Sequence, residues 1–439
     1  MRRRVSPRPG PWWGSAARLL PPTPLGRSLA AQSTLYAVGT GVFVSGNAVY
    51  FTRLVGLSPA QVGLGISIGG AASMLAAVPA GRLADRAGLR GSWTAAAVAE
   101  ALLYLAYPWV HSLPGFVGLL GLLSLAQALG AGGRGGYTLA VVPRGQRVRV
   151  LAFVRSALNI GFTLGALLAG LALATGSVEV IRAIPLLTAA VLLVNGLLIS
   201  RLPAAGRRAA EEAQRPEPGS RALRNRRFLL LSGLNGLMAV DQVLLSVVFP
   251  LWLVSRTDAP HAVLAWLYGT NTVLVVLLQV RASRGAETVA GATRSARVAG
   301  VAALGACAVM MTTAWTPGAA TIVLLWAGYV LVTCAELFHS AAGWGFLSEF
   351  SDPERRGEYQ GVWKLGQQAQ LMVGPVTCTW LAVSWRPEGL LVVGAVALVA
   401  SLLTARVAYG AQRWLRDRKP TGVPAGAVDT IEQTGPAGP

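Results

Sequence analysis

Residues 81–90 read GRLADRAGLR and connect two long apolar segments, at about 60–80 and 92–110. The decapeptide contains two glycines, an acid–base pair and a final arginine, namely Gly81, Gly88, Asp85, Arg86 and Arg90. A polar connection this short between two apolar segments predicts a tight turn between helices that cross a membrane. Its positive charge indicates the cytoplasmic side, where such turns collect Arg and Lys.

The composition of the whole chain excludes an ordinary soluble protein. Of its 439 residues, 53% are hydrophobic and 13% are charged, whereas soluble domains carry about 25% charged residues. Lipid offers no partner for free backbone groups, so long apolar segments must be helices. We therefore predict an all-α membrane protein with twelve transmembrane helices, at about 29–52, 60–80, 92–110, 114–142, 150–175, 180–200, 228–255, 261–281, 296–316, 319–347, 359–384 and 388–409.

The net charge of +20 is distributed in a way that reports topology. All but four of the 38 Lys and Arg residues fall in the two tails, in every second connection or at the adjoining span ends; the exceptions are Arg53, Arg182, Arg256 and Arg386. This alternation predicts that both termini are cytoplasmic and that the charge attracts anionic lipid rather than nucleic acid. The preference for Arg over Lys is typical of a GC-rich bacterial genome, so we expect a bacterial plasma membrane.

The sequence divides into two related halves. We predict a cytoplasmic tail (1–27), a first six-helix bundle (28–201), a central loop (202–227), a second six-helix bundle (228–409) and a second tail (410–439). A shift of 209 residues aligns Arg147 with Arg356, Arg155 with Lys364, Asn159 with Gln368, and Gly165 with Gly374. Two such repeats predict a site at their interface near the middle of the membrane.

The 81–90 segment resembles the G-x-L-A-D-R-x-G-R-[KR] loop of the major facilitator superfamily, from which only Leu89 departs. The resemblance extends over about residues 29–409 and implies twelve helices around a central cavity. It also implies a conformational latch formed by Gly81, Asp85, Arg86, Gly88 and Arg90. In that latch Asp85 meets the start of the eleventh helix, near Glu358, where negative charge is favoured.

A second resemblance concerns the fifth apolar segment. Gly161, Gly165 and Gly170 match the G-x-x-x-G-P-x-x-G-G pattern of antiporters in the superfamily, with Ala166 in place of the proline. The eleventh segment has Gly374 and Pro375. The pattern implies a drug:proton antiporter, and general packing of small residues between helices is the alternative interpretation.

Ionisable residues inside spans are costly and indicate functional sites. Asp241 lies in the seventh segment, and Glu336 lies in the tenth with His339 three residues further on the same face. In the superfamily the first, fourth, seventh and tenth helices line the cavity. Because desolvation favours the neutral form of a buried carboxylate, Asp241 and Glu336 are predicted to carry the coupling proton.

Other polar residues are candidates for the cavity: Asn47, Arg134, Arg155, Asn235, Asn271 and His339. For Arg134 and Arg155 the alternative is that each side chain extends to the membrane surface. For His339 the alternative is a hydrogen-bonded core residue. Glu100 is expected to serve helix packing, since the superfamily has its third helix on the outside of the bundle.

We therefore predict a monomeric secondary transporter without a cofactor or metal, whose partners are a small-molecule substrate, protons and the bilayer. Proton-coupled export of small amphipathic or drug-like molecules is the leading hypothesis. Proton symport, uniport, a non-transporting receptor and a membrane-embedded enzyme are the alternatives. An enzyme is disfavoured because the chain has only three histidines and lacks both H-E-x-x-H and a phosphate-binding glycine–lysine loop.

Overall fold

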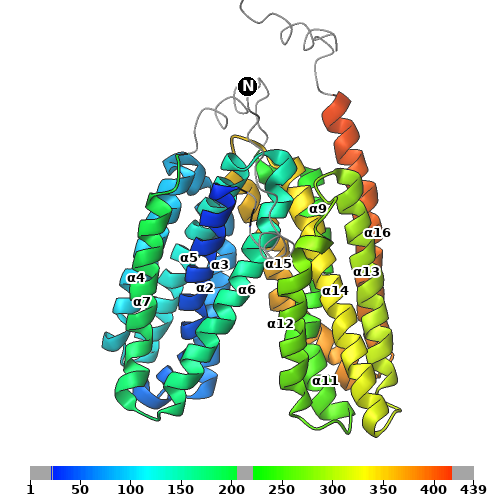
Figure 1. Cartoon of the computed structure of the whole chain (residues 1–439), viewed down its shortest axis with the longest axis horizontal. Helices are drawn as coiled ribbons and strands as arrows, with labels where there is room; N and C mark the ends of the chain where they lie inside the picture. Colours follow the sequence, from blue (N-terminus) through cyan, green and yellow to red (C-terminus); the bar gives the residue numbers. More distant parts are fainter. Residues whose placement is uncertain (1–20, 22, 205–220, 418–439) are drawn as a thin grey trace, which may run out of the picture.

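The computed structural model describes residues 21, 23–204 and 221–417, and within these ranges the chain is helical with no β-strand (Figure 1). Most of both predicted tails and of the predicted central loop therefore lies outside the described residues. The first half comprises α2 (Pro24–Tyr50), α3 (Pro59–Ala87), α4 (Leu89–Leu105), α5 (Leu113–Val141), α6 (Arg144–Ala174) and α7 (Val178–Ser200). Short turns at Phe51–Val55 and Tyr107–Trp109 extend α2 and α4.

The second half begins with a segment that runs continuously from Arg226 to Arg256. It consists of α9 (Arg226–Met238), α10 (Val240–Val243), the π-helical η4 (Leu244–Val248) and α11 (Phe249–Arg256). The helices that follow are α12 (Val263–Ala282), α13 (Val289–Thr312), α14 (Gly318–Phe350), α15 (Arg356–Thr379) with the π-helical η5 (Trp380–Trp385), and α16 (Gly389–Asp417).

Every predicted apolar segment lies on a helix, which confirms the all-α fold class and a multi-pass membrane protein. In the described part of the chain, nine helical segments are long and apolar enough to cross a bilayer. The exceptions are α2, α4 and α15. Of these, α4 has only 17 residues, and α15 carries Lys364 and several glutamines. For these three helices the prediction of membrane crossing rests on the sequence pattern and the repeat.

Local sequence signals account for several helix boundaries. Ser58 and Gln61 form a reciprocal capping box at the start of α3, with a proline at the first helical position. Ser112 caps α5, and Thr288 caps α13. Gly88 separates α3 from α4 with a φ of 92°, a backbone conformation that favours glycine.

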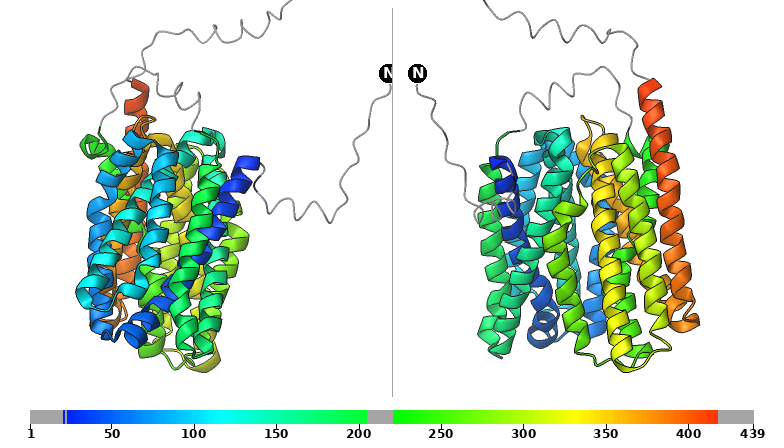
Figure 2. Two further views of the ribbon diagram at one scale, coloured as in Figure 1. Left: turned by 90° about the vertical axis from the view of Figure 1, so that its left-hand side faces the viewer. Right: turned by 45° about the vertical axis from the view of Figure 1, so that its right-hand side comes forward.

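The two halves have the same internal arrangement, which the views in Figures 1 and 2 display from several sides. In the first half α2 packs on α6 and α7, and α3 on α5; in the second, α13 packs on α14 and α16, and α9 on α15 and α16. Each half has its own apolar core, around Phe43 and Tyr107 in the first and around Phe249 and Trp252 in the second.

The contacts between the halves repeat the same symmetry. Helix α15 lies against α3 and α5, and its counterpart α6 lies against α12 and α14. A shift of 209 residues carries α6 onto α15, α3 onto α12 and α5 onto α14. The two groups of helices diverge toward the lower edge of Figure 1, whereas the start of α2 and the end of α16 lie at the upper edge.

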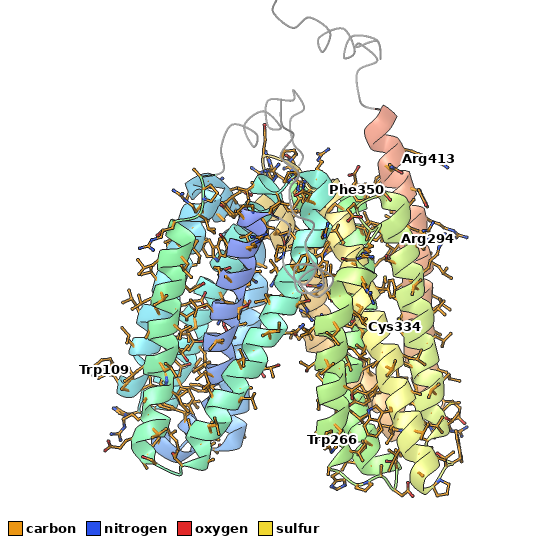
Figure 3. All side chains as sticks on the ribbon, in the orientation of Figure 1. Trp109, Trp266, Arg294, Cys334, Phe350 and Arg413 are labelled. Carbon is orange, nitrogen blue, oxygen red and sulfur yellow. The ribbon has the colours of Figure 1, made fainter. Side chains whose placement is uncertain are left out.

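Large apolar side chains cover the outer faces of the helices. Trp109 and Trp266, both labelled in Figure 3, are 75% and 70% exposed, and Leu75 is 78% exposed. Water would make such surface unfavourable, whereas lipid tails accept it and interfacial regions favour tryptophan. The exposed surface is therefore that of a protein embedded in a bilayer.

Candidate functional site

The 81–90 turn makes the closest contact between the two halves. A Cβ atom on Gly81 would collide with the carbonyl oxygen of Gly357, so only glycine allows α3 and α15 to approach this closely. Asp85 Oδ1 accepts a hydrogen bond from the Gly357 N–H at 2.7 Å, and Asp85 Oδ2 accepts one from the Glu358 N–H at 2.8 Å. Asp85 thus meets the start of the eleventh-helix segment, as the resemblance implied.

The arginines of this turn have different partners. Arg82, which is not one of the predicted latch residues, forms an ion pair with Glu358 at 3.0 Å. Arg90 Nη1 donates to the carbonyl oxygen of Leu202 at 2.6 Å. Arg86 is exposed and lines a surface pocket beside Asp85. Glu358 Oε1 also accepts from the Ala222 N–H at 3.1 Å, which links α15 to the segment before α9.

Deeper in the molecule, an ion pair joins the two halves. Arg155 Nη2 on α6 lies 2.8 Å from Glu336 Oε1 on α14. Asn271 on α12 donates to Glu336 Oε2 at 3.1 Å and to Thr333 Oγ1 at 3.0 Å. Both carboxylate oxygens of Glu336 therefore have partners. Arg155 binds this carboxylate and does not simply extend toward the membrane surface.

A second buried cluster lies within the second half. His339 Nδ1 on α14 lies 3.1 Å from Asp241 Oδ1 on α10, and His339 Nε2 lies 3.1 Å from Asn235 Oδ1 on α9. His339 of α14 thus bridges Asp241 and Asn235, which both belong to the Arg226–Arg256 segment. Asp241 is 1% exposed, and its Oδ2 has no hydrogen-bond partner among the described residues.

The backbone near Asp241 departs from regular helix. Helix α9 ends at Met238, α10 spans four residues around Asp241, and the π-helix η4 follows directly. Such π segments inside α-helices are frequent at functional sites. Asp241 and Glu336 do not contact each other, because Asp241 pairs with His339 and Glu336 pairs with Arg155.

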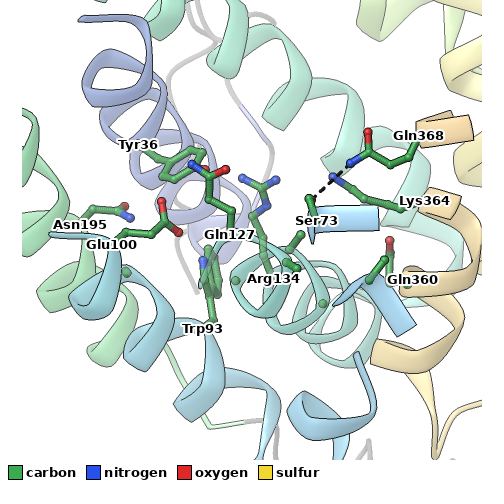
Figure 4. Close-up of a pocket in the computed structure, with 17 residues that line it drawn as sticks. Tyr36, Ser73, Trp93, Glu100, Gln127, Arg134, Asn195, Gln360, Lys364 and Gln368 are labelled. Atoms are coloured by element: carbon green, nitrogen blue, oxygen red, sulfur yellow. Dashed lines mark hydrogen bonds between the residues drawn. The ribbon is translucent and has the colours of Figure 1, made fainter. Parts of the chain in front are cut away.

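A polar pocket of about 200 Å³ lies between the halves, and Figure 4 shows the side chains that surround it. Helices α2 to α5 contribute Tyr36, Ser73, Trp93, Glu100, Gln127 and Arg134, α7 contributes Asn195, and α15 contributes Gln360, Lys364 and Gln368. Gln368 donates to Ser73 across the two halves at 3.4 Å. The Arg134 guanidinium lies over the Tyr36 ring, 5.3 Å from its centroid.

Two of the pocket's charged residues, Glu100 and Lys364, were not predicted to line a cavity. Glu100 is 4% exposed and lines the pocket, so it faces the interior of the bundle. Lys364 had been noted only as a repeat partner of Arg155. Its position inside a predicted span was the available signal, because an ionisable residue there indicates a functional site.

Two of the three predicted glycines of α6 lie at a close contact with α2. A Cβ atom on Gly161 or Gly165 would collide with the α2 backbone, at the carbonyl oxygens of Thr34 and Val38. Gly170 is exposed, with open space around it. At about 100° per residue, Gly165 lies about 40° around the helix from Gly161, whereas Gly170 lies about 180° away.

The remaining predicted positions are dispersed. Gly374 lies against the side chains of Gln370 and Val243, and Pro375 lies inside α15. Asn47 on α2 is 8% exposed, and its Oδ1 has no hydrogen-bond partner in the described ranges. Asn47 is not among the residues that line the pocket in Figure 4.

Two repeated helical bundles that enclose a polar site, with lipid-compatible outer faces, define a membrane transporter and not an enzyme. The family profile of the Major Facilitator Superfamily matches residues 29–368. The chain belongs to this superfamily, whose members bind small-molecule substrates and are often coupled to protons. No curated protein sequence matches the chain.

Several solved transporter structures share the fold. A human organic anion transporter is 16% identical, with a TM-score of 0.64 and coverage of 87% of this chain and 98% of its own. A bacterial homologue of the iron transporter ferroportin, in an outward-facing state, is 14% identical, with a TM-score of 0.69 and coverage of 89% and 100%. A proton:xylose symporter is 13% identical, with a TM-score of 0.67 and coverage of 87% and 94%. At these identities the similarity concerns the fold alone.

Proposed function

We propose that this chain is a proton-coupled secondary transporter that moves a small solute by alternating access. The observation that carries the proposal is the Arg155–Glu336 ion pair, because it joins the two halves inside the bundle. Protonation of Glu336 would remove its negative charge and weaken its contact with Arg155. Proton binding would then favour separation of α6 and α14, which is the link between a proton and a conformational change that coupling needs.

Asp241 is proposed as the second proton-coupling group. Its partner His339 lies 3.1 Å from Asp241 Oδ1, and Asp241 Oδ2 has no hydrogen-bond partner among the described residues, so it can receive a proton. Asp241 lies on α10 and His339 lies on α14. These helices belong to the seventh and tenth segments, which line the substrate path in the superfamily. A proton that enters this cluster would change the charge at the cavity wall without changing the fold.

The 81–90 turn is proposed to act as the conformational latch. In the structure the halves touch through Gly81, Asp85 and Arg82, all of which bind the first residues of α15. Opening on that side requires these contacts to break. With these contacts formed, the structure represents the state in which the latch side is closed.

We further propose a monomer in a bacterial plasma membrane with cytoplasmic termini and no nucleic-acid partner, which follows from the charge alternation. The hypothesis of export of small amphipathic molecules rests on the partial glycine pattern in α6. Close packing on α2 explains two of those glycines, Gly161 and Gly165, without an antiporter function. Proton symport is the second candidate for direction. The polar side chains around the pocket in Figure 4 favour a small polar solute over a large apolar one.

The test is a panel of solutes applied to everted membrane vesicles that contain a pH-sensitive dye. The wild-type chain is expected to move protons when one class of solute is added. A variant with both Asp241→Asn and Glu336→Gln is expected to lose that signal, while membrane insertion stays normal. Solute movement only down its own gradient and without proton movement in the wild type would make the chain a uniporter and would contradict the coupling.

A further inference from the structure

The described residues around the pocket in Figure 4 include two cations, Arg134 and Lys364, and one carboxylate, Glu100, whose charge acts on Arg134. Within the described residues, neither Arg134 nor Lys364 forms a hydrogen bond or an ion pair through its side-chain nitrogens. Glu100, the only carboxylate among the described residues that line the pocket, lies within ion-pair distance of neither. Two cations against one carboxylate leave at least one positive charge, which is costly inside a membrane protein.

The internal repeat indicates what is missing. A shift of 209 residues carries Arg155 onto Lys364, and the same shift carries Gln127 onto Glu336. On one side of the interface Arg155 binds the carboxylate of Glu336. On the other side Lys364 shares a pocket with Gln127, where an amide stands in place of the carboxylate. A carboxylate supplied by a ligand would restore the missing half of this pair.

We propose that this pocket binds the carboxylate group of a small organic anion, with Arg134 and Lys364 as the two cationic contacts. The inference names the substrate class and thus rests on the proposed transport function. Arg134 can bind a carboxylate through two parallel N–H donors, and Lys364 adds a point charge from the opposite half. The amides of Gln127, Gln360 and Gln368 supply neutral donors around the same space.

Position and size fit this role. Lys364 lies about 9 Å along α15 from Glu358, and Arg134 lies about 10 Å from the end of α5, at about 1.5 Å per residue. The site is therefore inside the bundle, beyond the latch. Its volume of about 200 Å³ is below the roughly 300–1,000 Å³ of drug-sized pockets. A small anion, or the anionic end of a larger one, matches that volume.

The ligand bridges the two halves in this arrangement. Arg134 belongs to α5 and Lys364 to α15, so a bound carboxylate adds a contact across the interface beside the Gln368–Ser73 hydrogen bond. Binding would therefore differ in strength between the two states of the transporter, which is what a transported substrate requires. Neutralisation of either cation removes one side of that bridge.

The test measures equilibrium binding of two series of near-isosteric probes to the purified full chain in a neutral detergent. The series are acetate, acetamide and acetamidinium, and benzoate, benzamide and benzamidinium, so charge changes while shape is nearly constant. In at least one series we expect the anion to bind at least about tenfold more tightly than its neutral and cationic analogues. Equal affinities, or preference for the cation in both series, would overturn the proposal.

Matched variants locate the binding. Arg134→Gln and Lys364→Gln should each weaken anion binding by about tenfold, and the double variant should abolish saturable binding. Arg297→Gln, which removes an exposed arginine on α13, should bind like the wild type. Lys364 forms no hydrogen bond or ion pair among the described residues, so we expect the Tm of Lys364→Gln to be unchanged or raised. Arg134→Gln loses the contact with the Tyr36 ring, so a small fall in its Tm is expected. A cooperative unfolding transition in both variants excludes misfolding as the cause. Wild-type affinity in both single variants would overturn the proposal.

Two further arms separate the alternatives. Phosphatidylglycerol tests whether a lipid headgroup is what binds the two cations. Binding of acetate or benzoate supports the proposal, whereas binding of the lipid alone overturns it. The vesicle panel separates this inference from the transport function. Proton-coupled movement of neutral or cationic solutes only would leave the transport function intact and overturn the anion site. Anion binding without any solute movement would leave the anion site intact and overturn the transport function.

Discussion

Arg155 of α6 and Glu336 of α14 are 2.8 Å apart, although they belong to different halves of the chain. The side chain of Glu336 is 9% exposed, and that of Arg155 is 33% exposed. The pair lies beyond the latch, at which Asp85 binds the start of α15. If the halves separate on the latch side during transport, this ion pair must break, so its strength sets part of the balance between the two states.

Removal of one member of this pair is expected to destabilise the observed state. A fully buried ion pair loses about 3–5 kcal/mol when one partner is removed; because Arg155 is partly exposed, we expect about 1–3 kcal/mol. Thermal unfolding of Arg155→Gln, Glu336→Gln and the double variant measures it. The double variant should lose less stability than the two single losses added together. Strict additivity would contradict a direct interaction.

The contact between Gly81 and Gly357 predicts a sharp steric effect. Gly81→Ala should push α3 away from α15, because the new Cβ collides with the Gly357 carbonyl oxygen. Gly91→Ala is the matched control, since nothing lies near its Cβ and alanine favours a helix by up to about 1 kcal/mol. Hydrogen exchange of the backbone amides at residues 356–360 should accelerate in the first variant only. Equal protection in both variants would refute the close contact.

Asp85→Asn tests the same contact without a steric change. The asparagine amide keeps one acceptor oxygen but loses the negative charge at the start of α15, an interaction of about 0.3–2 kcal/mol. We expect a folded, inserted protein whose conformational cycle is slower or unbalanced. Solute transport in vesicles is the readout. A wild-type rate would remove the functional role that we assign to the latch.

The Asp241–His339 pair predicts a separation of coupling from binding. Asp241→Asn imitates the permanently protonated acid, so transport driven by a pH gradient should be lost while solute exchange without a gradient continues. His339→Gln should impair coupled transport as well, because it removes the imidazole that contacts Asp241 Oδ1. His111→Gln is the control, since His111 is exposed. Normal gradient-driven transport in both site variants would mean that the coupling proton binds elsewhere.

Topology is predicted from the distribution of arginines. Reporter fusions at residues 215 and 425 should read cytoplasmic, and a fusion at residue 258, between α11 and α12, should read external. These positions also test whether α2, α4 and α15, which are less apolar or shorter than ordinary spans, cross the membrane. An external signal at residue 425 would mean an odd number of crossings and would contradict the twelve-span prediction.

The fold could be predicted from sequence because its signals are local and repeated. Runs of apolar residues fix the helices, the basic connections give their order, and Gly81 with Asp85 indicates the helix pair that touches. The offset of 209 residues also predicted that Arg155 and Lys364 occupy equivalent positions. The glycine pattern of α6 predicted helix contacts less well. Gly170 matches the pattern, but it lies on a different face of the helix from Gly161 and Gly165.

The partners of the charged residues could not be predicted in the same way. Whether Glu336 binds Arg155 or shares a proton with Asp241 depends on distances across helices that are far apart in the sequence. Glu100 was assigned to the outside of the bundle by analogy, yet the rotation of α4 directs it toward Arg134 and the pocket. Side-chain direction around a helix axis is set by packing with neighbouring helices, which composition does not report.

The most direct test of alternating access is a distance measurement between spin labels on the far ends of the two halves. Leu171 on α6 and Trp266 on α12 are both exposed there, and cysteines at these two positions, in a chain without Cys307, Cys334 and Cys378, would carry the labels. We predict two distance populations in the wild type and a shift toward the shorter one in Glu336→Gln, because loss of the ion pair destabilises the observed state, in which the helices diverge toward these ends (Figure 1). A single distance, identical in both proteins, would contradict the account.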